Sequence, residues 1–463
     1  MTNKRFFAPV LLSLGLLASS VSVLTTQGAV AEAASLPKCP LSALNNVTTP
    51  VQIDFWESMP QANATEIAAL TDQFNASQKK VHVNLVQQGT YDETWAKWQA
   101  GLTTGQLPAM AMIEDVYQQG IVDSRSILPV QSCENAAKFS TAKFLPRILA
   151  YFKINGIQQG LPFNISTPVL YYNKQAFQKA GITAIPTTLA QVSAAAKKLK
   201  AAGLGAFALK LDPWYEETWL ATSNQLLVNN NNGRTGRASA GTFNNSANVG
   251  LYSTLNAMVK SGLASTNPYL GSSAYDNLLG IGSGKYSMTI DTSAALGTIS
   301  SVLSSGQYPD VTLGVAQFPS LTSSPKGAIE AGGAALYISK KAPAAQQAAA
   351  WTFMAFLDSA QSQADWAVNT GYMPIRTDAA ALPTVTSYWA ANPGYAISYN
   401  SMKQGPTTYA STGAAIGPFG PVNNAIVTSL TSMFTGGAKP KTAVNSANSS
   451  ISQILQSYNS RVG

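Results

Sequence analysis

The sequence predicts an α/β protein with two lobes, a hinge and a cleft between the lobes. Three observations support this fold class. Strand-like and helix-like segments alternate between residues 51 and 113. Residues 160–174 join a polar, irregular piece to a short apolar strand, as expected where a chain crosses from one lobe to another. Later segments lead back to each lobe in turn, so several crossings form the hinge.

The first lobe is predicted to contain a parallel sheet. Apolar residues recur at strand or helix spacing in five consecutive segments, namely a strand at 51–56, a helix at 65–74, a strand at 81–86, a helix at 91–103 and a strand at 109–113. This order is typical of a parallel sheet with helices on both faces. Ligands of such sheets gather at the carboxyl ends of the strands. Polar residues follow the strands here, at positions 57–58, 87–91 and 114–115.

Residues 160–174 are the centre of the predicted arrangement. Pro168 separates two extended pieces, because its ring does not fit a helix interior and pushes Thr167 toward the extended region. The apolar residues 169–172 suit a buried strand. Asn173 then suits a helix N-cap, and Gly181 suits the end of that helix.

The second lobe is expected to follow this crossing. Thr188 and Gln191 form a capping-box pair that opens a helix. Further on we expect a strand at 206–209, a loop rich in aromatic and acidic residues at 211–219, a polar mobile loop at 229–236, a strand at 286–290, a return crossing at 313–318, and a strand and a helix of the first lobe at 331–338 and 343–357. The predicted boundaries are a signal peptide at 1–34, a first lobe at 46–165 plus 319–369, and a second lobe at 166–318 plus 370–463.

The N-terminus has the character of a secretory signal peptide. Lys4 and Arg5 precede an apolar run at 6–18, and small residues with an A-x-A pattern follow at 29–34. No cysteine comes soon after the apolar run, so a lipid anchor is not expected. No later stretch is long enough for a membrane span. The mature protein is therefore predicted to be exported and soluble.

Two cysteines, Cys39 and Cys133, are the only ones in the sequence. An exported protein folds in an oxidising compartment, where disulfides form and persist. We therefore predict a bridge between them. The alternative is two separate buried thiols.

Charged residues are scarce and biased toward the basic. There are 29 basic and 21 acidic residues, only 11% of the chain in all, where about 25% is usual. The lysines are scattered and no basic run exceeds two residues, which argues against nucleic-acid binding. A surface with few carboxylates tolerates acid well, because fewer groups must be protonated as the pH falls. An acidic habitat is a hypothesis that this composition supports.

Few residues of the sequence are candidates for catalysis. His82, the only histidine, lies in the middle of a predicted strand, so neither a Ser-His-Asp set nor a histidine-rich metal site is expected. A carboxylate pair for glycoside hydrolysis is the alternative that stays open. Its candidates are Glu114, Asp115, Glu216, Glu217 and Asp291.

Aromatic residues at loop positions favour a binding cleft instead. A sugar or polyol is held by aromatic faces and a few placed hydrogen-bonding groups. The aromatic candidates are Tyr91, Trp214, Tyr215 and Tyr372. Four tryptophans at helical spacing are expected in the core, Trp95, Trp98, Trp351 and Trp366. Trp56, at the end of a strand, suits either place.

Several stretches of the sequence resemble one known family. They are LPFNISTPVLYYNKQAFQKAG at 161–181, FWESM at 55–59, GTYDETW at 89–95, AGGAALYIS at 331–339 and TGYMPIR at 370–376. Their order and spacing are similar to those of the glycerol-3-phosphate-binding and glycerophosphodiester-binding periplasmic proteins of ABC importers, within the maltose-binding-like group of extracellular solute-binding proteins. The resemblance implies a two-lobed periplasmic-binding-protein fold with a hinge and an interlobe cleft.

The resemblance also implies ligand-binding residues. The family's positions fall on Tyr91, Asp115, Ser166, Trp214, Thr292, Gly333 and Tyr372. One departure concerns an arginine that meets the phosphate in the family's C-terminal glycine-rich loop, because our alignment places Pro418 there. No Arg or Lys occurs between Gln404 and Gly437. A buried phosphate dianion without a cation is costly, so a neutral sugar or polyol, or a phosphodiester with its phosphate near solvent, is favoured over glycerol-3-phosphate.

The predicted function is the substrate-binding component of an ABC importer. The two lobes would close on a small polar solute and deliver it to a membrane permease. We expect no catalysis, cofactor, metal or nucleic-acid partner, and a monomer. Two alternatives stay open, a secreted glycan-acting enzyme with a carboxylate pair and a surface or sensor module that binds without transport.

Overall fold

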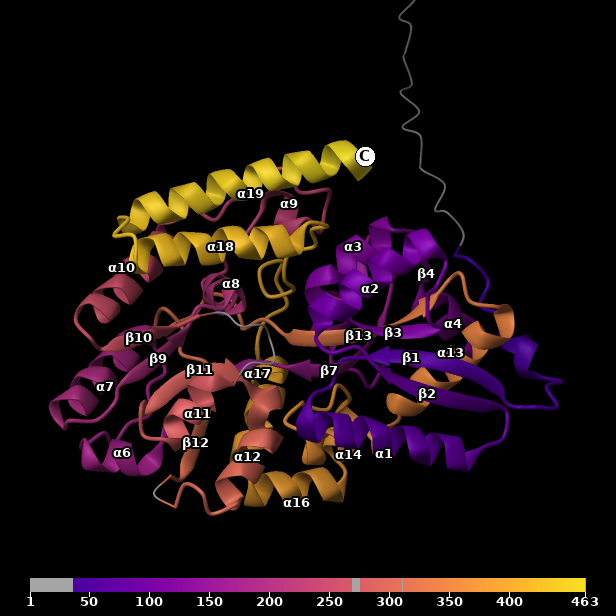
Figure 1. Cartoon of the computed structure of the whole chain (residues 1–463), viewed down its shortest axis with the longest axis horizontal. Coiled ribbons are helices and arrows are strands. Elements are labelled where there is room, and N and C mark those ends of the chain that lie inside the picture. Colours follow the sequence, from indigo (N-terminus) through magenta and orange to yellow (C-terminus); the bar gives the residue numbers. More distant parts are fainter. Residues whose placement is uncertain (1–35, 269–274, 310, 463) are drawn as a thin grey trace, which may run out of the picture. The chain divides into compact units, whose positions relative to one another are not determined.

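The computed structural model describes residues 36–268, 275–309 and 311–462. The predicted signal peptide at 1–34 lies outside these residues. Pro37–Gly463 forms one compact unit. Within it are two separate β-sheets of five or more strands, each with its own helices, and we call these two parts the first and the second lobe (Figure 1).

The first lobe is built on a mixed sheet in the order β2-β1-β3-β13-β4, with β7 also paired to β13. Its strands are β1 (Val51–Glu57), β2 (Val81–Gln87), β3 (Met110–Glu114), β4 (Ile127–Leu128), β7 (Leu161–Ser166) and β13 (Gly332–Ser339). β1 pairs parallel with β2 and β3, as predicted, and β13 runs antiparallel to β3. The helices are α1 (Gln61–Ser77), α2 (Tyr91–Thr104), α3 (Gln118–Asp123), α4 (Val130–Ala137), α5 (Pro146–Tyr151), α13 (Ala344–Leu357) and α14 (Ala360–Asn369).

The helices of the first lobe cover both faces of its sheet. In Figure 1, α2 and α3 lie above strands β1, β2 and β3, while α1 and α14 lie below them. β3 is buried over its first four residues and β13 over nearly its whole length. Such near-continuous apolar strands are expected where helices cover both faces.

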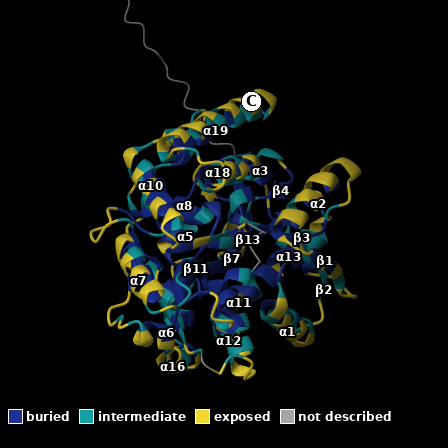
Figure 2. Cartoon of the chain, turned by 60° about the vertical axis from the view of Figure 1, so that its left-hand side comes forward, coloured by how far each residue is buried: buried dark blue, intermediate teal, exposed yellow. Residues whose placement is uncertain are grey.

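The second lobe is built on a sheet in the order β10-β9-β11-β8-β12. Its strands are β8 (Pro168–Asn173), β9 (Phe207–Lys210), β10 (Ala264–Asn267), β11 (Met288–Thr292) and β12 (Leu313–Gln317). The helices nearby are α6 (Lys174–Lys179), α7 (Leu189–Ala201), α8 (Pro213–Thr222), α10 (Ser246–Lys260), α11 (Asp276–Gly282), α12 (Leu296–Ser304), α18 (Phe419–Phe434) and α19 (Pro440–Val462). Strands β7, β8, β9 and β11 are buried along their whole length. Helices α7, α10 and α19 expose their outer faces (Figure 2).

The crossing at residues 160–174 consists of two extended pieces, as predicted, but the piece expected to be irregular is the regular, buried strand β7. β7 belongs to the first sheet and β8 to the second, and only Thr167 separates them. Pro168 begins β8, a position where its missing N–H costs little. The Asn173 side chain caps α6 by accepting from the N–H groups of Gln175 and Ala176.

Three segments of the second lobe differ from the prediction. Residues 211–219 were expected to be a loop, but α8 occupies most of them, because Asp212 caps the helix and Pro213 suits its first turn. α8 is buried on almost every side, so it has no amphipathic pattern to read. Residues 229–236 contain the short α9 (Asn229–Asn232), whose Asn230 and Asn231 have left-handed backbone angles. Residues 313–317 form β12, an edge strand of the second sheet, so the chain crosses back only after it.

The lobe boundaries given above stay a prediction. Two large clusters of buried apolar side chains accompany the two sheets, one for each lobe. Tyr372, Met373 and Ile375 pack into the cluster of the first lobe. The packing of the first lobe therefore extends past the predicted boundary at residue 370.

A disulfide joins Cys39 and Cys133, as predicted, with their Cα atoms 4.9 Å apart. Cys39 precedes the short 3₁₀ helix η1 (Leu41–Leu44), and Cys133 lies on α4. Both cysteines are buried in the first lobe. The bridge therefore fastens the start of the described chain to this lobe.

Candidate functional site: the cavity between the lobes

A cavity of about 820 Å³, which includes the space at its open mouth, lies where the two lobes meet. All seven residues predicted to bind ligand line it: Tyr91, Asp115, Ser166, Trp214, Thr292, Gly333 and Tyr372. They are spread over some 280 positions of the sequence, and the fold brings them together. Their role in binding stays a prediction.

The carboxyl ends of strands place most of these side chains. Tyr91 opens α2 directly after β2, behind a capping box in which Thr90 and Glu93 satisfy each other's backbone N–H groups. Asp115 follows β3, and Thr292 ends β11. Trp214 lies in the first turn of α8, after β9. Ligands of α/β sheets are expected at such strand ends.

Hydrogen bonds fix two tyrosines at one side of the cavity. Asn164 Nδ2 donates to the hydroxyl of Tyr91 at 2.6 Å, and the hydroxyls of Tyr91 and Tyr372 are 3.3 Å apart. The ring of Tyr372 also stacks on Trp366, with centroids 5.4 Å apart. Both tyrosines are at least nine-tenths buried, so their rings present fixed faces to the cavity.

A second group of contacts joins the two lobes across the crossing. Thr292 Oγ1 donates to Ser166 Oγ at 3.0 Å, and it accepts from the N–H of Ala294 at 3.1 Å. Beside them, Gly333 has φ +137°, and a Cβ there would lie 2.0 Å from the carbonyl oxygen of Asn164. Only glycine fits at that position.

Carboxylates are concentrated at this cavity. Five of the chain's 21 acidic residues line it: Asp92, Glu114, Asp115, Asp212 and Asp291. Among the described residues that line it, none is lysine, arginine or histidine. Burial, together with the charges of Asp115, Asp92 and Asp212, raises the pKa of Glu114 well above its usual value. Burial also raises the pKa of Asp115 to about 7, although hydrogen bonds from Tyr151 and from the N–H of Val116 favour its charged form.

The loop around Pro418 contains no cation, but an arginine from another segment approaches it. Arg234 donates from Nε to the carbonyl of Gly413 at 3.1 Å, and from Nη1 to the carbonyls of Tyr151 and Lys153 at 2.8 and 3.0 Å. Its Nη2 donates to the carbonyl of Thr412. The N–H groups of the guanidinium thus donate to backbone carbonyls. Arg234 is not among the cavity-lining residues.

Sequence reasoning missed several residues of the cavity. They are Pro60, Asp92, Val116, Tyr117, Asp212, Tyr275, Ala294, Gly332 and Asn423. Most are sequence neighbours of predicted residues, so the predicted positions gave the only signal for them. Tyr275 and Asn423 had no such signal, since helices remote in the sequence bring them in. Of the tryptophans expected in the core, Trp98, Trp351 and Trp366 are buried and Trp95 is half-buried.

His82 is exposed on β2, outside the cavity. Within the described residues, no helix combines the length and apolar character needed to cross a membrane. Of the carboxylates considered for glycoside hydrolysis, Glu114, Asp115 and Asp291 line the cavity, whereas Glu216 and Glu217 are buried on α8.

Comparisons with known proteins agree with this architecture. The chain is 28% identical over 417 residues to the sn-glycerol-3-phosphate-binding periplasmic protein UgpB of Salmonella typhimurium, covering 88% of this chain and 93% of that protein. It is 29% identical over 406 residues to UgpB of Pectobacterium atrosepticum, covering 85% and 89%.

Two solved structures show the same fold. UgpB from Mycobacterium tuberculosis in complex with glycerophosphocholine matches with a TM-score of 0.75 and 21% identity, over 89% of this chain and all of that one. The GacH receptor of Streptomyces glaucescens, solved without ligand and with acarbose, matches with a TM-score of 0.73 and 20% identity, over 88% and 98%. Residues 69–393 also match the model of a family described as bacterial extracellular solute-binding protein. The chain belongs to this family of extracellular solute-binding proteins.

Proposed function

We propose that this protein is the extracytoplasmic receptor of an ABC importer, which captures a sugar, polyol or glycerophosphodiester between its lobes and delivers it to a membrane permease. The observation that carries the proposal is the cavity, because side chains from both lobes line it and a ligand there would hold the lobes together. The curated relatives named above are periplasmic binding proteins, which supports export and binding without turnover.

The chemistry of the cavity favours a neutral, hydroxyl-rich solute. Six aromatic side chains line it: Tyr91, Tyr117, Trp214, Tyr215, Tyr275 and Tyr372. Aromatic faces cover the apolar surface of a sugar ring or a choline-like group. Carboxylate oxygens accept hydrogen bonds from hydroxyls, whereas they repel a phosphate dianion. A phosphodiester carries one negative charge fewer than a monoester and suits the cavity if its phosphate remains near solvent.

Calorimetry with four ligands tests the proposal. Maltose, ribitol, glycerophosphocholine and glycerol-3-phosphate span the solute classes, and we expect one of the first three to bind more tightly than glycerol-3-phosphate. Glycerol-3-phosphate binding at least as tightly as the others would overturn the ligand class. X-ray scattering on the same samples should show a smaller radius of gyration with ligand. Oligosaccharides released or shortened on incubation would favour the glycan-acting alternative.

A further inference from the structure

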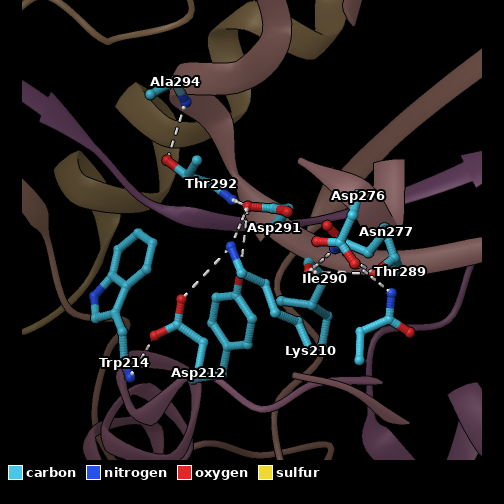
Figure 3. Close-up of polar contacts among 12 residues, drawn as sticks. Lys210, Asp212, Trp214, Asp276, Asn277, Thr289, Ile290, Asp291, Thr292 and Ala294 are labelled. Carbon is cyan, nitrogen blue, oxygen red and sulfur yellow. Dashed lines mark hydrogen bonds and ion pairs between the residues drawn. The ribbon is translucent and has the colours of Figure 1, made fainter. Parts of the chain in front are cut away.

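A buried lysine lies beneath the part of the cleft that the second lobe forms. Lys210 ends β9 and is only 2% exposed. Its Nζ is 3.8 Å from Oδ2 of Asp212 and 3.8 Å from Oδ1 of Asp291 (Figure 3). Both aspartates line the cavity, whereas Lys210 does not. Lysine is seldom fully buried, because an ammonium must be paired to leave water.

Each aspartate in turn anchors a backbone segment that carries a predicted ligand residue. Asp212 Oδ1 accepts from the N–H of Trp214 at 3.2 Å and so caps α8. Asp291 Oδ1 accepts from the N–H of Thr292 at 2.7 Å. Figure 3 shows Lys210 between the two aspartates, with Trp214 and Thr292 on the far sides of them. The ammonium is therefore shared between the ends of two strands, β9 and β11.

The charges explain why this arrangement needs a cation. By itself burial lowers the pKa of Lys210, but the charges of Asp291, Asp212 and Asp276 outweigh it and the pKa is raised, so the ammonium keeps its proton at neutral pH. The hydroxyl of Tyr215 also donates to Asp291 Oδ1, at 3.3 Å. Burial raises the pKa of Asp212 and of Asp291, and Lys210 opposes this in both. Removing the ammonium would leave two buried carboxylates that repel each other, which is strongly unfavourable. The two strand ends would then separate, or one of the two carboxylates would take up a proton.

We propose that Lys210 is a positioning residue of the binding cleft, which ties the ends of β9 and β11 together and thereby fixes Trp214 and Thr292 for the ligand. This inference rests on the proposed function and adds a residue that the family resemblance does not assign. Lys210 acts through Asp212 and Asp291, without touching the ligand. Loss of the ion pairs from Lys210 to Asp212 and Asp291 should therefore displace the Trp214 ring and weaken ligand binding, even though the same residues still line the cavity.

The first test is binding by Lys210→Met, with Lys260→Met as the control. Lys260 is an exposed lysine of the same lobe, in the last turn of α10. The probe is whichever of maltose, ribitol and glycerophosphocholine the unmodified protein binds most tightly. At pH 7.5 we expect Lys210→Met to bind it roughly ten- to a hundred-fold more weakly, and Lys260→Met to bind as the unmodified protein does.

The pH dependence separates positioning from packing. At pH 5 one of the two carboxyl groups in Lys210→Met should take up a proton and donate a hydrogen bond to the other, which rejoins the strand ends. The ratio of its affinity to that of the unmodified protein should therefore rise as the pH falls. A ratio close to one at pH 7.5, or an equal loss at both pH values, would overturn the proposal.

A second readout needs no ligand. The indole N–H resonance of Trp214, assigned with Trp214→Phe, should shift or broaden in Lys210→Met at pH 7.5, while the resonances of the buried Trp98 and Trp351 stay in place. If Lys210→Met does not fold, Asp291→Asn breaks the same ion pair and should move the same resonance. An unmoved Trp214 resonance in the folded variant overturns the inference. Failure of the unmodified protein to bind any probe would instead count against the proposed function and leave this readout intact.

Discussion

At the scale of single residues, one glycine decides where the main aromatic face of the cavity lies. A Cβ on Gly332 would be 2.4 Å from Cζ2 of Trp214, so the indole reaches its place only because this residue has no side chain. Gly332 begins β13 in the first lobe, and Trp214 belongs to α8 in the second. The tryptophan therefore packs across the boundary between the lobes, beside the ligand cavity.

Replacing Trp214 by alanine should weaken ligand binding. The ring covers apolar surface of the bound solute, so its loss should cost ~1–3 kcal/mol, which is roughly a ten- to hundred-fold drop in affinity. Calorimetry with the tightest-binding probe measures this. Tyr409→Ala is a matched control, because Tyr409 is 48% exposed and lies outside the cavity. If Trp214→Ala binds the ligand as tightly as the control does, Trp214 does not contribute to ligand binding.

The residues that the sequence could identify are those tied to strand ends or to family-like motifs. Asp115 and Thr292 each come two residues after a predicted strand, and the structure places both at the cavity. Lys210 was not identified, because its partner Asp291 lies 81 positions further along the chain and on another strand. A pattern that depends on contacts between remote segments leaves no periodic signal. The same holds for Arg234, whose carbonyl partners come from both lobes.

At the scale of elements, the amphipathic segments were predictable and the fully buried ones were not. The strands and helices between residues 51 and 114 follow their apolar periodicity, and the structure confirms each of them. α8 was mistaken for a loop because it is buried all round, so its apolar and polar residues show no helical period. The polar loop predicted at 229–236 contains one short turn, α9, in which Asn230 and Asn231 have left-handed backbone angles. Asparagine tolerates these angles, and no pattern of apolar residues reveals them.

Removing the disulfide should destabilise the first lobe. The Cys39–Cys133 bridge closes a loop with a sequence separation of 94, which in the chain-entropy model contributes about 4–5 kcal/mol by restricting the unfolded chain. Unfolding of Cys39→Ser/Cys133→Ser by urea should show a lower midpoint, with binding retained at low temperature because the bridge lies away from the cavity. Thiol titration of the denatured, unreduced protein should find no free thiol. Two titratable thiols would show that the bridge does not form in exported protein.

At the scale of the whole molecule, three carboxyl groups are buried where the two lobes face each other. Asp115 follows β3 of the first lobe, Glu217 lies on α8 of the second, and Glu330 precedes β13. Burial, and then the charges of its neighbours, raises the pKa of Glu217 and of Glu330 well above the usual value. Other ionisable groups interact with this cluster: Glu114, Tyr117, Tyr151, Asp212, Glu216, Arg234 and Tyr337. Arg234, the one cation among them, opposes the raised pKa of Glu330.

Stability should therefore increase as the medium becomes acidic. Below about pH 3 the three carboxyl groups are protonated in the folded and the unfolded chain, so burying them carries no charge penalty. Between about pH 4 and about 7, the pKa to which Asp115 is raised, the unfolded chain has released protons that the folded chain still holds, so the free energy of unfolding falls as the pH rises. This direction suits an acidic habitat.

Thermal unfolding without ligand at pH 5 and pH 8 measures this dependence. The melting temperature should be higher at pH 5, and Glu217→Gln should reduce the difference. Asp72→Asn, at an exposed position on α1, should leave the difference unchanged. A melting temperature that falls from pH 8 to pH 5 would contradict the prediction.

The contacts that Asp123 of α3 makes with Arg237 and with Tyr458 of α19 should influence how long a bound ligand stays. Asp123 of the first lobe accepts from both terminal nitrogens of Arg237, at 2.9 and 3.0 Å, and from the hydroxyl of Tyr458 at 2.8 Å. Arg237 and Tyr458 belong to the second lobe, so these bonds form only while the lobes are together. The Arg237 side chain is 40% exposed, and exposed ion pairs typically contribute ~0.2–1 kcal/mol.

We therefore expect Arg237→Gln to lower ligand affinity by up to about fivefold. Most of the change should be faster dissociation, since affinity changes within one complex usually affect the off-rate. Lys441→Gln removes the same charge from an exposed position in the first turn of α19 and should leave dissociation unchanged. The difference in ligand dissociation rate between the two variants should also become smaller at high salt, because salt screens an exposed ion pair. Equal dissociation rates for both variants in stopped-flow measurements at low salt would show that the ligand alone holds the lobes together.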